Sequence, residues 1–370
     1  MDSLFLEIIQ VSIGRRITLS CVPSESDWKL IYHHAKKQAI IGVCFVGIQN
    51  LYANSPRQVC NLPDNLKRHW MTLAFKIQKQ NITLNQQCKF IQAKFLDDGF
   101  DTCVLKGQGV ASYYNSDLKL YRQSGDIDVW VNATCDEVMS YVNSISPNRE
   151  FDMKHTHLEI LSNTVVEVHW WPSMPVNPLY KKSLQVYYTE QVQRQCQHKV
   201  RLDENVEITA PDTQFEIIHV MYHIFNHFLY EGIGLRQLMD LYFVLVNGEL
   251  EDNAKYKILN TLKKIGLASF APAVMWVLCH VFNMPLACSI GSVDERSGKL
   301  LLKEIYDGGN FGFHSKENRV INESFFHRML RRMKRRIRLV RYNFWGVIMR
   351  PFVKLKTLIW KRRMIKRYNL

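Results

Sequence analysis

The sequence predicts an α+β fold in which a small mixed sheet is flanked by helical N-terminal and C-terminal regions. Two observations lead to this prediction. Apolar residues recur at helical spacing before residue 99 and again after residue 213, whereas short strand-like runs bounded by turn residues lie between residues 100 and 171. In addition, 47% of the 370 residues are hydrophobic, which is enough to bury more than one core. This composition excludes a disordered or fibrous protein.

The predicted elements follow in order along the chain. Helices are expected over 27–51, 64–96 (ended by Gly99), 110–115, from Thr134, where Glu137 completes a capping box, and over 213–283; strands are expected over 101–106, 126–131, 153–161 and 165–170. The last two strands are expected to form a hairpin around residues 162–163. We divide the chain into a helical N-terminal region (1–99), an α/β core (100–212), a helical C-terminal domain (213–323) and a basic tail (324–370).

The charge of the chain is concentrated in that tail. Lys and Arg total 48 against 34 Asp and Glu, but residues 324–370 contain 16 of the basic residues and no acidic one. Pro351 is expected to break the tail helix. We considered a helix docked on the body, peripheral binding to an anionic membrane surface, and nucleic-acid binding, which ranks last. An apolar stripe supports the helix: Phe326, Leu330, Met333, Ile337, Val340, Phe344 and Val347.

The cysteines and the apolar segments indicate the compartment. Nine scattered cysteines without a Cys-x-x-Cys pair fit neither a disulfide framework nor a zinc ribbon, so a reducing cytosol is expected. Acidic residues at the start argue against a signal peptide. The uncharged segment 266–292 contains Pro272 and His280 and is interpreted as a buried helix. We therefore expect a cytoplasmic protein, or one at the inner face of the membrane.

An Asp-x-Asp pattern is the most informative local feature. Asp126 and Asp128 lie two residues apart on a predicted strand and therefore point to the same side of it. Adjacent carboxylates repel each other, and Mg²⁺ that is also chelated by substrate phosphates relieves this repulsion. Glu167 stands between apolar residues of a later strand. If the two strands are neighbours, the three acids converge and can hold one or two metal ions; the alternative is a solvated sheet face without a role.

The segment 104–109 leads from a strand through a glycine turn into a helix. Free backbone N–H groups there, together with Lys106, can receive a phosphate. Gly107 and Gly109 also begin a dinucleotide-binding fingerprint. The third glycine position is Ser112, however, and Asp126 opens its strand as one of a pair, so a dinucleotide fold is rejected.

Several segments taken together resemble one known family, the uncharacterised nucleotidyltransferases of the DNA-polymerase-β-like superfamily. The resemblance spans residues 27 to about 360. One difference is the phosphate turn, where the superfamily has Gly-Gly or Gly-Ser. The matching segments are Leu105-Lys106-Gly107, Tyr113-Tyr114, Leu120, Arg122, Gly125-Asp126-Ile127-Asp128, Glu167-Val168-His169-Trp170, His223, His227 and the run 235–241.

The resemblance implies an enzyme that moves a nucleoside monophosphate from an NTP to an acceptor. Mg²⁺ or Mn²⁺ would be held by Asp126, Asp128 and Glu167, with Glu167 as ligand or general base. The acceptor is open, although similar proteins occur beside surface-polysaccharide genes in bacteria. The alternative is a non-catalytic binding module of the same fold at an anionic membrane. The residues expected around the nucleotide are Lys106, Gly107, Gln108, Gly109, Arg122, Ser124, Gly125, His169 and Arg236.

Histidines add candidate ligands. His155 and His157 share a strand face near Glu167, where they reach the site or serve the structure. Three others recur every four residues on one helix face, which suits either a zinc clamp or, as we prefer, buried or phosphate-facing histidines: His219, His223 and His227.

Arg236 and Asp240 lie four residues apart on a predicted helix. Two interpretations stay open. Either the two residues form a surface ion pair, or Arg236 contacts a nucleotide phosphate across a cleft.

Overall fold

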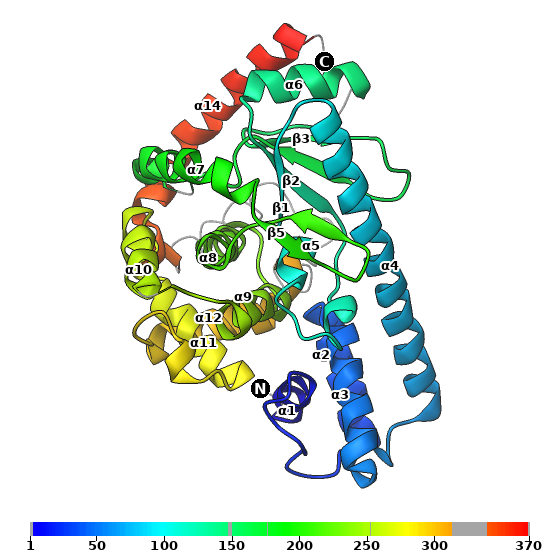
Figure 1. Ribbon diagram of the computed structural model, residues 1–370. Coiled ribbons are helices and arrows are strands. Elements are labelled where there is room, and N and C mark those ends of the chain that lie inside the picture. Colours follow the sequence, from blue (N-terminus) through cyan, green and yellow to red (C-terminus); the bar gives the residue numbers. More distant parts are fainter. Residues whose placement is uncertain (1–2, 147–149, 176, 252, 313–338, 369–370) are drawn as a thin grey trace, which may run out of the picture.

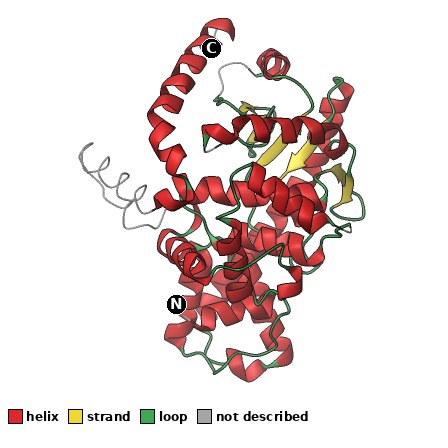
Figure 2. Cartoon of the chain, turned by 90° about the vertical axis from the view of Figure 1, so that its left-hand side faces the viewer, coloured by secondary structure: helices red, strands yellow, loops and turns green. Residues whose placement is uncertain are grey.

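The structure is a computed structural model of the 370-residue chain, and it describes residues 3–146, 150–175, 177–251, 253–312 and 339–368. Helices dominate, and a small sheet lies among them at one end of the molecule (Figure 1; Figure 2). The predicted α+β class is confirmed.

The N-terminal region consists of four helices, and one of our boundaries there was wrong. The helix expected over 27–51 is two helices, because the chain breaks at residues 38–40, where Ala39 has a left-handed φ of 55°. The buried side chain of Gln38 fills this break, donating to the Ile305 carbonyl and accepting from the Leu235 amide. The four helices are α1 (Ser3–Ser12), α2 (Glu25–Lys37), α3 (Ile41–Asn54) and α4 (Asp64–Asp97).

Helix α4 connects the helical part of the molecule with the sheet (Figure 1). Its first half buries Trp70 in the core shared by the surrounding helices, and its second half buries Ile91 and Phe95 against the sheet. Gly99, with a φ of 85°, follows the end of the helix as expected. One long helix therefore fixes the position of the sheet relative to the helical body.

The main sheet has the strand order β1-β2-β4-β3. Strands β1 (Thr102–Leu105) and β2 (Ile127–Val131) are antiparallel, β2 and β4 (Val166–His169) are parallel, and β3 (His155–Leu158) forms the expected hairpin with β4. Helix α6 (Cys135–Ile145) starts with the expected capping box of Thr134 and Glu137. A second sheet of β5 (Lys199–Arg201) and β6 (Glu207–Thr209) was not predicted.

Successive side chains of a strand point to opposite sides, so the main sheet has two different faces. One face is apolar and packs against α4 and α6, with Val104, Ile127, Val129, Val131, Val166 and Val168 buried in it. On the other face, Trp130 stacks on Phe215 of helix α8 (Thr213–Tyr230), with ring centroids 5.4 Å apart. Asp128 and Glu167 belong to this second face, because they alternate with the valines.

Helix α5 (Gly107–Ala111) begins directly after β1, so residues 107–109 are its first turn, not the separate turn that we expected. Positive φ angles at Lys106 (48°) and Gly107 (35°) redirect the chain between strand and helix. Gly109 lets the helix approach β1, because a Cβ there would lie 2.5 Å from the Val104 carbonyl oxygen.

The remaining helices, except the last, share one apolar core with α8 and with α1–α3. Helix α11 is the buried helix expected within 266–292. Among the described residues, no helix has both the length and the apolar character to cross a membrane. These helices are α7 (Lys181–Gln195), α9 (Leu235–Asn247), α10 (Ala254–Lys264), α11 (Ala271–Phe282), α12 (Glu295–Gly308) and α14 (Phe344–Tyr368).

Helix α14 lies along α6 and α7 (Figure 1). Residues 324–338 of the predicted tail lie outside the described residues, so most of the expected apolar stripe does too. Pro351 was expected to break the helix, but it lies within α14. Proline removes one backbone hydrogen bond, and a helix continues past it when its other contacts suffice. Met364 and Trp360 supply such contacts at the core beneath the sheet.

Candidate active site

Three carboxylates meet on one face of the main sheet. Asp128 is in register with Glu167 across the parallel strands β2 and β4, so the two side chains point the same way. Asp126 precedes β2 by one residue and is exposed. All three line one cavity of about 370 Å³. The strand adjacency on which the sequence argument depended is therefore present.

The same cavity brings together most of the residues expected around a nucleotide. Its opposite wall comes from α8 and α9, through residues such as His223 and His227. Of the predicted residues, the cavity is lined by Lys106, Gly107, Arg122, Ser124 and Arg236.

The other predicted nucleotide contacts lie elsewhere. The buried side chain of Gln108 donates to Asn85 of α4 at 2.6 Å, and Gly109 packs against β1. Gly125 is exposed, and His169 is fully buried behind the acids. The spacing of these four residues in the sequence predicted that they lie near the site, but it did not predict which way each of them faces.

Asp128 is held by two neighbours. Its Oδ1 atom lies 2.7 Å from Nζ of Lys106 and 2.9 Å from Nε2 of His169, and its side chain is 3% exposed. Burial by itself raises the pKa of Asp128, but Lys106 and His169 outweigh burial and hold that pKa well below its usual range. Asp128 is therefore a fixed anion at the floor of the cavity.

Asp126 and Glu167 differ in their electrostatic surroundings. The negative charge of Asp128 raises the pKa of Asp126 above its usual value. Burial raises the pKa of Glu167, but the hydrogen bond with His169 and other charges lower it to about 2. The repulsion between Asp126 and Asp128 is thus only partly relieved by Lys106.

A buried ion pair joins the loop before β2 to helix α9. Arg122 contacts Asp240 through two bonds, Nε to Oδ1 at 2.7 Å and an Nη2 to Oδ2 at 2.8 Å, and it donates to Ser124 at 2.6 Å. Tyr114 also donates to Asp240, at 2.7 Å. Arg236 donates to the Gln123 carbonyl at 2.6 Å. Sequence reasoning missed the Arg122–Asp240 pair, because it saw Arg236 and Asp240 as neighbours on one helix.

Helix α8 carries two buried polar side chains next to this cavity. Glu216 and His219 are fully buried, and within the described residues no hydrogen-bond partner is present for either carboxylate oxygen or either ring nitrogen. Burial raises the pKa of Glu216 to about 8 and lowers that of His219 to about 3. The only sequence signal for Glu216 was an acid inside the apolar run 215–218.

One group of side chains in the described part of the chain has the spacing of metal ligands: His155, Glu167 and His169. Their ligand atoms all lie within 4.8 Å of one another. The three α8 histidines form no such group among those residues. Two of the α8 histidines, His223 and His227, instead contact each other with ring centroids 4.2 Å apart.

The family model of the uncharacterised nucleotidyltransferases matches residues 24–283. The chain belongs to this family. The resemblance inferred from the sequence is confirmed over most of the chain, and membership indicates a transferase whose substrate is unknown. Among solved structures, the chain is similar to an antigenic nucleotidyltransferase-like protein from Paracoccidioides brasiliensis, with 9% identity, a TM-score of 0.32, and coverage of 54% of this chain and 92% of that chain. No curated protein matches the sequence.

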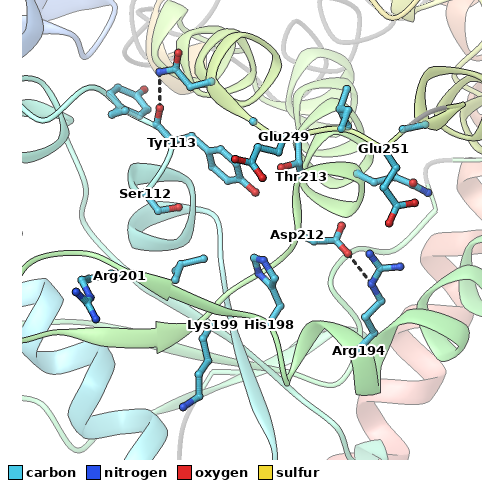
Figure 3. A pocket seen from close by; sticks show the side chains of 17 residues that line it. Ser112, Tyr113, Arg194, His198, Lys199, Arg201, Asp212, Thr213, Glu249 and Glu251 are labelled. Atoms are coloured by element: carbon cyan, nitrogen blue, oxygen red, sulfur yellow. Dashed lines mark hydrogen bonds and ion pairs between the residues drawn. The ribbon is translucent and has the colours of Figure 1, made fainter.

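A second and larger cavity of about 770 Å³ shares no lining residue with the first. Figure 3 shows Arg194, Lys199 and Arg201 on one side of it and Glu249 and Glu251 on the other. Ser112 and Tyr113, which follow α5, line this cavity, whereas Gly107 and Val110 of α5 line the carboxylate cavity. The segment around α5 therefore contributes to both cavities.

Proposed function

We propose that this nucleotidyltransferase family member transfers a nucleoside monophosphate from an NTP to a hydroxyl-bearing acceptor, with pyrophosphate as the leaving group. The observation that carries the proposal is the register of Asp128 with Glu167, with Asp126 beside them at the edge of one cavity. Cationic groups that can face a triphosphate, Lys106 and Arg236, line the same space. A cavity lined by both carboxylates and cationic side chains suits a metal-bound polyanionic substrate.

The residues fit the divalent ion that the family implies. Three carboxylates supply hard oxygen ligands, and the raised pKa of Asp126 marks a repulsion that a cation relieves. Asp126, Asp128 and Glu167 would hold Mg²⁺ or Mn²⁺ together with phosphate oxygens. When bound, such an ion neutralises the charge that develops on the transferred phosphoryl group.

The chain's own residues would bind the phosphates, position the loop before β2 and accept the proton of the attacking hydroxyl. Lys106 pairs with Asp128 in this structure, and we assign it to the triphosphate when substrate is present, because it is the cation nearest the acids. Arg122 is committed to Asp240, so it positions Ser124 and the loop before β2. Arg236 faces the cavity from α9 and orients the phosphates. Glu167, next to Asp128, completes the ligand set or receives the proton of the attacking hydroxyl.

Release of pyrophosphate tests this function. The purified full chain is incubated with Mg²⁺ and each of the four NTPs, with sugars and sugar phosphates as the first acceptors. We expect release with one NTP and its loss in Asp126→Asn. Wild-type protein that releases no pyrophosphate and binds none of the four NTPs contradicts the proposal.

The second candidate function is a non-catalytic module at an anionic membrane on the cytoplasmic side, and α14 favours it. This helix exposes aromatic and aliphatic side chains, including Phe352 (66%), Leu355 (58%) and Leu358 (58%). Between them stand Lys354 and Lys356. Exposed apolar groups mixed with cations suit the interface of an anionic bilayer, where each cation contributes about 1 kcal/mol.

Co-sedimentation with vesicles separates this candidate from the enzyme. Vesicles of phosphatidylcholine with anionic phosphatidylserine should retain the full chain, and the double change Phe352→Ser and Leu355→Ser should release it. The control Leu286→Ser changes an exposed leucine (71%) outside α14. Equal retention of all three proteins, or no retention of wild type, removes the membrane module.

A further inference from the structure

Strands β3 and β4 place a second set of potential ligands beside the three carboxylates. In the β3–β4 register, His155 is opposite His169 and His157 is opposite Glu167, so all four side chains are on the same face of the sheet. Three of them, His155, Glu167 and His169, also have their ligand atoms close together. This set contains two imidazoles and therefore differs from the all-carboxylate set at the edge of the cavity.

The distances within this set are close to those of one coordination shell. Oε2 of Glu167 lies 3.1 Å from Nδ1 of His155 and 3.2 Å from Nε2 of His169, and Nε2 of His169 lies 2.9 Å from Oδ1 of Asp128. Ligand atoms that each stand about 2.0–2.2 Å from one tetrahedral ion are about 3.3–3.6 Å apart. Small rotations of these side chains therefore bring the ligand atoms around one ion.

The two ring nitrogens of His169 face different partners. Its Nδ1 atom lies 3.3 Å from the Trp171 carbonyl oxygen. Its Nε2 atom lies 2.9 Å from Oδ1 of Asp128 and 3.2 Å from Oε2 of Glu167. A ligating histidine has this arrangement, with the outer N–H donated to a backbone carbonyl and the inner nitrogen aimed at the metal.

Hydrogen bonds do not satisfy both ring nitrogens of His155. Its Nδ1 atom is buried and makes no hydrogen bond in the described structure, although Oε2 of Glu167 is 3.1 Å away in a contact of unsuitable geometry. The charge of the surroundings favours a cation as well. The lining of the cavity contains six carboxylates and four lysine or arginine side chains, an excess of two negative charges that one divalent ion balances.

We propose that His155, Glu167 and His169 form a resident site for a transition-metal ion of the Zn²⁺ class, with Asp128 as the fourth oxygen. Two imidazole ligands favour such ions over Mg²⁺, which prefers oxygen ligands and water. The site shares Asp128 and Glu167 with the ion that accompanies an NTP, but it does not depend on the proposed transfer reaction, because the metal binds without nucleotide. Its place beside Asp128 fixes the orientation of Glu167 at the cavity floor.

Metal content measures this site directly. The full chain is stripped with a chelator, dialysed against Zn²⁺ with Mg²⁺ in excess and analysed by mass spectrometry for metal per chain. We expect wild type to hold about one more Zn²⁺ than His155→Asn, and His169→Asn to match His155→Asn. The control His198→Asn removes a histidine of the second cavity and should match wild type. Exposed cysteines such as Cys21 contribute a background that is equal in all four proteins.

Two outcomes overturn the site: wild type that holds no more Zn²⁺ than His155→Asn, or a Zn²⁺ that Mg²⁺ displaces. Co²⁺ absorption of wild-type protein gives a second readout if a variant fails to fold, and absence of ligand-field bands that depend on His155 also contradicts the proposal. Asp126→Asn distinguishes this inference from the proposed function, because it should keep the Zn²⁺ while losing nucleotide binding.

Discussion

The carboxylate cavity and the second cavity hold charged side chains in very different ways. In the carboxylate cavity, Asp128 and Lys106 are 3% and 16% exposed and contact each other. In the second cavity, Arg194 and Lys199 are 63% and 68% exposed, although the partner of Arg194 is only 13% exposed. The charged side chains of the larger cavity are thus less fixed in position than those of the carboxylate cavity.

This difference shows what identifies a site in this fold. A buried charge must have fixed partners, because leaving it unpaired costs several kcal/mol. Such partners are pre-organised before any substrate arrives, whereas exposed lysines and arginines rearrange freely. Chemical organisation, more than volume, therefore supports the proposal that the carboxylate cavity is the reaction site.

The largest expected effect contrasts one acid from each cavity. Glu167→Gln should lower kcat/KM for nucleotidyl transfer by about 10²–10³-fold, because the change removes the carboxylate that would bind the divalent ion or accept the proton of the attacking hydroxyl. Glu249→Gln should change it by less than about twofold, since that acid is exposed and outside the carboxylate cavity. Pyrophosphate release measures both. Equal losses in the two variants would end the distinction between the cavities.

The next prediction compares two arginine substitutions by their effect on the free energy of unfolding. Arg122→Met leaves Asp240 buried without its bidentate partner, which should cost about 3–5 kcal/mol of unfolding free energy. Arg194→Met breaks an exposed pair with Asp212 and should cost about 0–1 kcal/mol. Urea unfolding with unchanged m-values gives both numbers. A cost below 1 kcal/mol for Arg122→Met contradicts the account of a buried, organised cavity.

The smallest effect concerns Glu216 and pH. Its folded pKa of about 8 lies above the ordinary value of a glutamate, 4.5, so its contribution to stability is complete below about pH 4.5 and is lost as the pH rises towards 8. Between pH 6 and 7, wild type should lose about 1 kcal/mol relative to Glu216→Gln. The exposed Glu249→Gln should follow wild type. Parallel curves for wild type and Glu216→Gln would show that Glu216 is solvated.

Local patterns predicted which sheet face carries Asp128 and Glu167. The alternation around Asp128 and Glu167 has a period of two residues and depends on nothing beyond each strand. The capping box at Thr134 and the end of α4 at Gly99 are local signals of the same kind. These features were therefore visible in the sequence alone.

Long-range partnerships were not visible. Arg122 and Asp240 are 118 residues apart, and nothing near either residue indicates the other. Gln38 fills the break between α2 and α3 through contacts with α9 and α12, which spacing does not encode. Pro351 stays helical because distant residues hold α14 in place. Each error arose where tertiary contacts decide between two locally acceptable structures.

Calorimetric titration with Mg²⁺ and each NTP tests the central claim most directly. Wild type and Arg201→Ala, which changes the second cavity, should bind one NTP with equal affinity, while Asp126→Asn should bind it at least about tenfold more weakly. Unaltered binding by Asp126→Asn, or a comparable loss in Arg201→Ala, would place the nucleotide outside the carboxylate cavity.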